Sequence, residues 1–189
     1  SYLIMVSINP GRPVMVRHVS IQINGAAKND SAFQQLISQS GLAVNTQLNT
    51  PRYNELKSNL LNLASQKGYF DAQMIKNEIT INRRSQSASI LISLDSGDRY
   101  TIQTITIDKT PYNAAFIKKY LTIKPGDYFD IQQINKSKKN LINSNLFDNA
   151  SLQNTDQNST NHTINLNLST QAKEKVGYLI GAGYGTDTG

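Results

Sequence analysis

One pattern of apolar residues occurs twice along the chain, 86 residues apart. In each copy, apolar positions alternate with polar ones, slip by one residue and then alternate again. The copies are Val14-x-Val16-x-x-Val19-x-Ile21 and Tyr100-x-Ile102-x-x-Ile105-x-Ile107. Alternation with a period of two is typical of a half-buried strand, and a one-residue slip indicates a β-bulge. Because both copies follow a glycine at the same spacing, the pattern predicts two repeated units.

After the first copy, the chain carries signals for two helices and two further strands. Asp30 or Ser31 can cap a short helix, and Thr50 as N-cap before Pro51 indicates the start of a longer one, which Gly68 ends. Alternating apolar residues then predict a strand to about residue 81 and another over about 88–94. The first unit is therefore expected to run strand, helix, helix, strand, strand.

The same order follows the second copy. Asn113 can cap a short helix. Asp130 and Gln133 have the spacing of a capping box at the start of a second helix, and Asn145 can end that helix in the left-handed conformation. A strand is expected at about 148–154, followed by a polar loop over Gln153–His162 and a last alternating strand. The order of elements therefore predicts an α+β fold for both units, in which a three-stranded mixed sheet is covered on one face by two helices.

The ends of the chain differ from these units. The first residues, Leu3-Ile4-Met5-Val6, look like the last strand of a preceding domain. From Val176 to Gly185, bulky and small residues alternate as they do in a strand of a membrane β-barrel. We therefore expect residues 1–9 to end one domain, 10–96 and 97–172 to form two more, and 173–189 to begin a barrel.

Charge and composition narrow the classes of function. The net charge is +6, and the lysines fall between apolar positions on the predicted helices, where solvated lysines normally lie. The positive charge leaves an anionic membrane or an acidic partner as alternatives. It does not favour nucleic acid, because such a site would concentrate basic residues with stacking aromatics. The chain has no cysteine, which excludes disulfides, and no apolar run of roughly 20 residues that would form a membrane helix.

Signals for catalysis are weak. His18 lies at the bulge and His162 in a polar loop, and the acidic residues are scattered without a nearby base or metal ligand. The glycines near residue 181 do not complete a dinucleotide fingerprint, because Thr186 stands where the third glycine belongs. We therefore expect no enzyme activity and no catalytic, cofactor-binding or metal-ligating residue.

Several segments resemble POTRA domains, the periplasmic modules that precede an outer-membrane barrel in the BamA/TamA assembly-factor superfamily. The element order fits, and so do Gly68-Tyr69-Phe70-Asp71-Ala72 and its counterpart Leu146-Phe147-Asp148-Asn149-Ala150. The sequence is most similar to TamA-like proteins in Pro10-Gly11-Arg12-Pro13-Val14, Ser96-Gly97-Asp98-Arg99-Tyr100 and the stretch from Gly181 to Gly189. The resemblance departs where Lys109 matches Gly25 and where Asn145 matches Gly68.

The resemblance implies the second and third POTRA domains of a protein in the outer membrane of a Gram-negative bacterium, with this region in the periplasm. It implies a role in assembling barrel proteins or secreting autotransporters, with unfolded precursors, the partner TamB and the chain's own C-terminal barrel as partners. No cofactor and no nucleic acid are implied. A platform for lipid transport with TamB is the alternative, and its mark would be an apolar groove continuous between the units.

A physical mechanism follows if a sheet edge is exposed, because its unpaired backbone groups can accept an extended peptide as an added strand. The family favours the second strand of each unit as that edge. The candidate residues are Ala72, Gln73, Met74, Ile75, Lys76, Asn77, Glu78 and Ile79 in the first unit, and Asp148, Asn149, Ala150, Ser151 and Leu152 in the second. The opposing interpretation is that charges such as Lys76 and Glu78 blunt these edges.

Three further interpretations concern the connections. Arg83-Arg84 is expected to form a solvated turn, and Tyr69-Phe70 is expected to belong to the core at the start of a strand. The linker Leu94–Arg99 is short and has no flexible glycine-serine tract, so limited hinge motion is expected.

Overall fold

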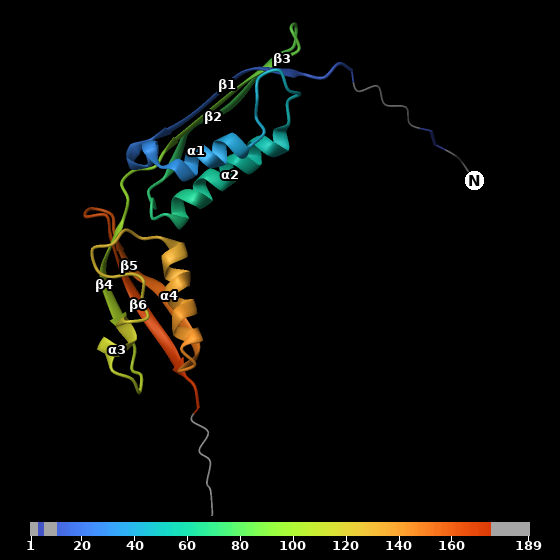
Figure 1. The fold of residues 1–189 in the computed structure, drawn as a ribbon. Helices are drawn as coiled ribbons and strands as arrows, with labels where there is room; N and C mark the ends of the chain where they lie inside the picture. Colours follow the sequence, from blue (N-terminus) through green and yellow to red (C-terminus); the bar gives the residue numbers. More distant parts are fainter. Residues whose placement is uncertain (1–3, 6–10, 175–189) are drawn as a thin grey trace, which may run out of the picture.

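The computed structural model describes residues 4–5 and 11–174, which form two units that follow each other along the chain (Figure 1). The strand expected at 1–9 and the barrel strand expected at 173–189 lie almost wholly outside the described residues. None of the described helices combines the length and apolar character needed to cross a bilayer.

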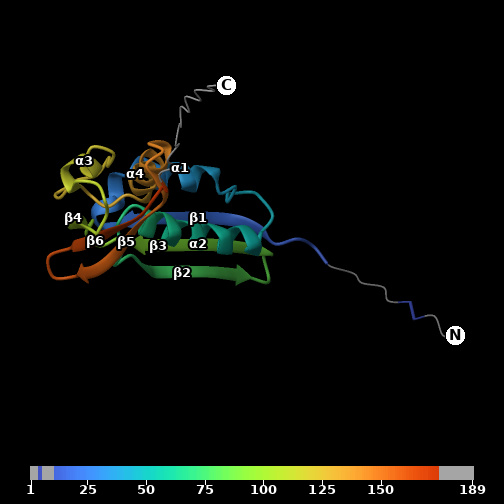
Figure 2. The ribbon, with the colours of Figure 1, turned by 90° about the horizontal axis from the view of Figure 1, so that it is seen from below.

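The first unit is a mixed sheet with helices on one face. Its elements are β1 (Met15–Asn24), a 3-10 helix η1 (Gly25–Asn29), α1 (Ser31–Gln39), α2 (Thr50–Gln66), β2 (Gln73–Asn82) and β3 (Ser87–Asp95). The strand order is β1-β3-β2, with β1 parallel and β2 antiparallel to β3. Figure 2 shows α1 and α2 together on the same side of this sheet.

The second unit repeats this topology. Its elements are β4 (Thr101–Ile107), α3 (Ala114–Lys118), α4 (Ile131–Asn143), β5 (Phe147–Asn158) and β6 (Thr163–Ala172). The order is β4-β6-β5, again with one parallel and one antiparallel pair. The predicted α+β fold of two units is therefore confirmed.

Each unit has its own core between sheet and helices. The first core is centred on Ile90, Ile92 and Leu94 of β3, all fully buried, and the second on Ile164, Leu166 and Leu168 of β6, which are buried to at least 99%. β3 and β6 are the middle strands, and their apolar faces pack against the helices. The core therefore follows directly from the alternating residues of the last strand in each unit.

The slip in the repeated pattern is a β-bulge in both units. The pairing register shifts between Val16 and His18 in β1 and between Ile102 and Thr104 in β4. Before each bulge, the outer side of the strand bonds to a loop. Val16 N–H donates to Thr46 and Ile102 N–H to Asp127, at 2.8 Å each. The bulge thus separates the part of the strand that bonds to this loop from the part that does not.

The N-cap residues of α1, α3 and α4 agree with the sequence. The side chains of Asp30, Asn113 and Asp130 each accept a hydrogen bond from a backbone N–H in the first turn of their helices. Thr50 was predicted to cap α2, but Asn49 does so, because its side chain accepts from Arg52 N–H and Thr50 is already helical. Both residue types cap well, so composition alone does not distinguish them.

The predicted polar loop over Gln153–His162 is wrong. β5 continues to Asn158 and pairs with β6 throughout, so only residues 159–162 form the turn. All side chains from 153 to 158 are exposed, which means that this half of β5 extends beyond the cover of the helices. A strand with solvent on both faces has no apolar alternation, and the pattern therefore missed it.

Asn145 tests the left-handed end of α4, where its φ is 59°. Replacing it with Ala is expected to lower the free energy of unfolding by about 1 kcal/mol, because a Cβ without a local hydrogen-bonding group is disfavoured there. Asn145→Gly is expected to preserve or raise stability, as measured by urea denaturation. Asn143→Ala, at the exposed last residue of the helix, is the control; a loss equal to that of Asn145→Ala would contradict the explanation.

Candidate functional site

Both predicted binding strands lie at sheet edges. β2 pairs only with β3 and β5 only with β6, so each has an outer side without a ladder among the described residues. The candidates Gln73–Ile79 lie within β2, Ala72 directly precedes it, and Asp148–Leu152 lie within β5. The two sets belong to separate sheets, so they form two candidate edges and not one site.

The edge strand β2 has one apolar and one charged face. Met74 and Ile79 are half-buried against the first core, whereas Lys76 and Glu78 are exposed. The two charged residues pair with Ser93 and Leu91 of β3, on the side of the sheet away from the helices. The charges therefore lie over one face of the sheet and leave the backbone edge itself uncovered.

Two isoleucines of β2 remain exposed although their strand contributes to a core. Ile75, in a bulge between Met74 and Lys76, exposes 53% of its surface, and Ile81 exposes 49%. Ile81 pairs with Ala88 on the helix-facing side, near the end of the sheet. An added strand could cover both residues, which makes this edge partly apolar.

The β5 edge is longer and more polar. It spans 12 residues and contains register shifts between Phe147 and Asn149 and between Asn154 and Asp156. Beyond Leu152 it presents only polar side chains. A ligand on this outer half would therefore meet backbone groups with little apolar contact, which is recognition that does not depend on sequence.

The face of the second sheet away from the helices is unsuited to packing. In the second unit, the hydroxyl of Thr104 donates to Asn165 Oδ1 at 2.6 Å and that of Thr106 to Asn167 Oδ1 at 2.8 Å. Asn167 in turn donates to Asp108 at 3.1 Å. Burying such a lattice of amides and hydroxyls would be costly unless every group kept a partner. Binding is therefore more favourable along the edges than over this face.

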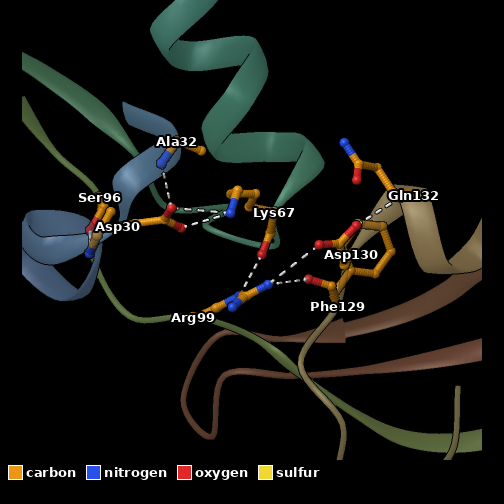
Figure 3. A network of polar contacts seen from close by, with 9 residues as sticks. Asp30, Ala32, Lys67, Ser96, Arg99, Phe129, Asp130 and Gln132 are labelled. Atoms are coloured by element: carbon orange, nitrogen blue, oxygen red, sulfur yellow. Dashed lines mark hydrogen bonds and ion pairs between the residues drawn. The ribbon is translucent and has the colours of Figure 1, made fainter. Parts of the chain in front are cut away.

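Arg99 connects the two units (Figure 3). Its Nε donates to the carbonyl of Lys67 at 2.7 Å, and Nη2 donates to the carbonyl of Phe129 at 3.3 Å and lies 3.8 Å from Asp130 Oδ2. The guanidinium also lies over the rings of Tyr69 and Tyr128. One side chain in the linker thus joins the end of α2 to the start of α4.

Lys67 carries this network back into the first unit. Its Nζ donates to both carboxylate oxygens of Asp30, at 3.1 and 2.9 Å. Partial burial would by itself raise the pKa of Asp30, but hydrogen bonds from Lys67 and from Ala32 N–H, with the charges of Lys67 and Arg99, outweigh it. The pKa of Asp30 therefore lies below its ordinary value.

A second contact across the junction centres on Tyr100, which is fully buried. Its hydroxyl donates to Asp71 at 2.9 Å, and its backbone N–H donates to Gly68 at 2.9 Å. His162 packs edge-on against the Tyr100 ring, with its two nitrogens each 3.7 Å from a carboxylate oxygen, one of Asp71 and one of Asp98. Burial, with a smaller contribution from Asp71, raises the pKa of the Tyr100 phenol.

Residues at the end of α2 fit closely against the second unit. Phe70 packs against the second core, with its ring centroid 5.2 Å from that of Tyr100 and 4.9 Å from that of Phe129. Gly68 has a φ of 86°, and a Cβ there would lie 2.9 Å from Phe129 Cβ. This position therefore needs glycine both for its backbone conformation and for the close approach of the units.

Sequence reasoning missed this junction. The sequence predicts Gly68 only as a helix end and Tyr69-Phe70 as core residues at the start of a strand. In the structure Tyr69 is buried in the first core, whereas Phe70 packs on the second. His162 was assigned to a loop, and Arg99 had no assigned contact. The one signal was the grouping of Gly68–Ala72 and Ser96–Tyr100 among the segments that carried the resemblance.

Arg99→Lys tests the junction. Lysine cannot reach the carbonyls of Lys67 and Phe129 with one planar group, so we expect the free energy of unfolding to fall by about 1–2 kcal/mol. The units should also tumble more independently, with separate rotational correlation times in NMR relaxation. Arg84→Lys, in the exposed turn after β2, should change neither quantity. Unchanged relaxation in the Arg99 variant would contradict the assigned role.

The Asp30–Lys67 pair predicts a pH dependence. Since the pKa of Asp30 is lowered on folding, its stabilisation is present above its ordinary value of 3.8 and is lost as pH falls through the folded value. Asp30→Asn keeps the helix cap but not the charge, so it should cost about 1 kcal/mol at neutral pH and progressively less below about pH 4. Urea denaturation across pH measures this difference, with exposed Asp148→Asn as control. A difference that persisted in acid would contradict the assignment.

Comparisons with known proteins agree with this geometry. Residues 100–172 match the POTRA family, described as surface antigen variable number repeat. Over 136 residues, or 68% of the chain, the sequence is 22% identical to the outer membrane protein assembly factor BamA of Neisseria meningitidis serogroup B. The matched part covers 17% of that protein, so the chain spans only a small part of the length of this curated relative.

Solved structures show the same fold. POTRA3-5 of Haemophilus influenzae BamA superposes with a TM-score of 0.55 at 15% identity, covering 83% of this chain and 61% of that one. BamA of Haemophilus ducreyi lacking POTRA domains 1–3 gives 0.59 at 13% identity, with coverages of 84% and 29%. POTRA1-2 of Omp85 from Anabaena gives 0.54 at 10% identity, with 86% and 99%. The described chain therefore has the fold of two tandem POTRA-like units, and the second of them matches the POTRA family.

Proposed function

We propose that this chain is a periplasmic scaffold of an outer-membrane protein assembly factor, and that the β2 and β5 edges bind extended segments of barrel or autotransporter precursors. The observation that carries the proposal is that both strands, of 10 and 12 residues, are paired along one side only within the described residues. Nascent barrel strands are extended peptides and match this edge chemically. The role is binding and not catalysis.

Each edge is expected to bind weakly. Four or five added backbone hydrogen bonds of roughly 0.5–1.5 kcal/mol each leave only a few kcal/mol after the ligand has been ordered. Such a free energy corresponds to dissociation constants of roughly millimolar. Weak binding suits an assembly factor, because the precursor must leave the scaffold to enter the membrane.

The two edges differ in what they favour. The exposed Ile75 and Ile81 give β2 an apolar component, and strands of barrel precursors carry an apolar residue at every second position. The outer half of β5 offers backbone groups alone. We therefore propose that β2 binds more tightly and that β5 adds a weaker second contact, which gains from the effective concentration of a tethered ligand.

The finer identity is also a proposal. The two units would be the second and third POTRA domains of a TamA-like protein, with boundaries at 10–96 and 97–172 and a barrel after residue 172. The surface of the second unit would then dock TamB. These assignments follow from the sequence resemblance, and photocrosslinking from the 97–172 surface to TamB would test them.

The lipid-transport alternative is less favoured by the junction. The cavity between α2 and α4 has a volume of about 190 Å³ and includes Lys67 and Asp130 in its lining. Lys67 is paired with Asp30 and Asp130 with Arg99, so charged groups occupy the region that a continuous apolar groove would cross. An acyl chain would have to desolvate these charges, which is unfavourable.

Site-specific photocrosslinking tests the binding edges. A photoreactive phenylalanine analogue replaces Lys76 on β2 or Asn149 on β5, and an unfolded porin diluted from urea serves as the precursor. The matched controls carry the same analogue at Ser89 on β3 and at Asn167 on β6, which lie on the sheet face away from the helices at positions where the middle strand is paired on both sides. We expect several-fold higher crosslinking from the edge positions.

Equal yields from edge and middle strands would contradict edge binding and would instead indicate nonspecific adsorption to the sheet face. Crosslinks from Lys76 but not from Asn149 would restrict the function to β2. Higher yields from Asn149 than from Lys76 would contradict the proposed ranking of the two edges.

A further inference from the structure

The free half of β4 is a sheet edge that the proposed function does not use. Up to its bulge, β4 bonds on its outer side to residues 126–129 through Tyr100 and Ile102. Beyond the bulge, Asp108 N–H points inward and donates to Leu168 of β6 at 2.9 Å. Backbone groups alternate in direction along a strand, so those of Ile105 and Ile107 point outward. They have no backbone partner on that side among the described residues.

An apolar pocket adjoins this free edge. It has a volume of about 290 Å³, and four of its lining residues are Ile105, Leu121, Ile123 and Pro125. Ile105 is therefore shared, because its backbone belongs to the edge and its side chain to the pocket wall. The other lining residues belong to the end of α3 and the loop after it, a segment that lies beside β4 in Figure 1.

Two lysines complete the pocket lining, Lys118 at the end of α3 and Lys124 in the loop. Both are exposed, and neither forms an ion pair with a described residue. The nearest acid in sequence, Asp127, accepts a hydrogen bond from the backbone N–H of Lys124. The pocket thus combines an apolar floor with two lysine ammonium groups that form no ion pair with a described carboxylate.

We propose that this edge and pocket form a further peptide site, which takes an extended segment with an apolar residue and acidic residues two positions away. Residues two apart lie on the same face of a strand. A segment paired with Ile105 and Ile107 therefore places its apolar side chain in the pocket and those acidic groups beside Lys118 and Lys124. The site is separate from β2 and β5 and rests on the proposed function only in that its ligand is again extended chain.

Two nine-residue peptides with the same composition test the inference. In the capped peptide TVDTLTDVT the two aspartates share the face of the leucine, and in TVTDLDTVT they lie on the opposite face. NMR titration of the full chain with the first peptide is expected to shift the amides of 104–107 and 121–125 in a saturable way. The second peptide should bind about five- to tenfold more weakly, the effect of roughly two exposed charge pairs.

Charge-reversal variants distinguish an effect of the two pocket lysines from an effect of the net charge of the chain. Lys118→Glu with Lys124→Glu should weaken TVDTLTDVT by about tenfold and remove its preference over the second peptide. Lys136→Glu with Lys139→Glu on α4 changes the net charge equally but does not touch the pocket, so the affinity for TVDTLTDVT and its preference over the second peptide should both persist. Equal binding of the two peptides, or equal effects of the two double variants, would overturn the proposal. Shifts along 73–82 or 148–158 without shifts at 104–107 would overturn it while leaving the proposed function intact.

Discussion

A three-stranded sheet cannot pair all of its backbone, and this constraint shapes the whole chain. Each unit places the strand whose apolar residues are most deeply buried, β3 or β6, in the middle, so that it is paired on both sides. Two edges per sheet then remain, and a small domain must hydrate, cover or use them. The first strands are covered in part by loops up to their bulges, whereas β2 and β5 are uncovered throughout the described residues. The edges that stay open are therefore where the proposed function places binding.

The junction answers a related problem, because each core is small. Units of this size bury roughly 60–65% of their unfolded surface and gain from a neighbour. Phe70 adds apolar surface from one unit to the core of the other, and Arg99 satisfies carbonyls at the ends of two helices. Both contacts require the units to approach closely, which Gly68 permits. The same few residues thus end a helix, connect two cores and set the relative position of the sheets.

The sequence predicts what periodicity encodes and misses what it does not. Alternation identified the strands, and the one-residue slip identified both bulges, because apolar side chains must keep facing the helices on either side of the extra residue. The outer half of β5 was missed since it has no buried face, and Asn49 was passed over since Thr50 caps almost as well. Arg99 bonds to carbonyls about 30 residues away in sequence, and no local pattern records such a contact. The choice of β2 and β5 as edges came from the resemblance, because three predicted strands leave their order open.

The proposed edge binding depends on the geometry of the junction. A backbone edge discriminates poorly between sequences, so a chain that used edges alone would bind any extended peptide with similar, low affinity. Holding two edges at a fixed separation favours ligands long enough to reach both, and the advantage falls if the units move independently. Arg99, Lys67 and Asp130 do not lie on β2 or β5. Their contacts hold the two units together, and the separation of the two edges depends on them. Selectivity for long, unfolded chains would then depend on the side chains of the junction, while the affinity of each contact depends on the backbone.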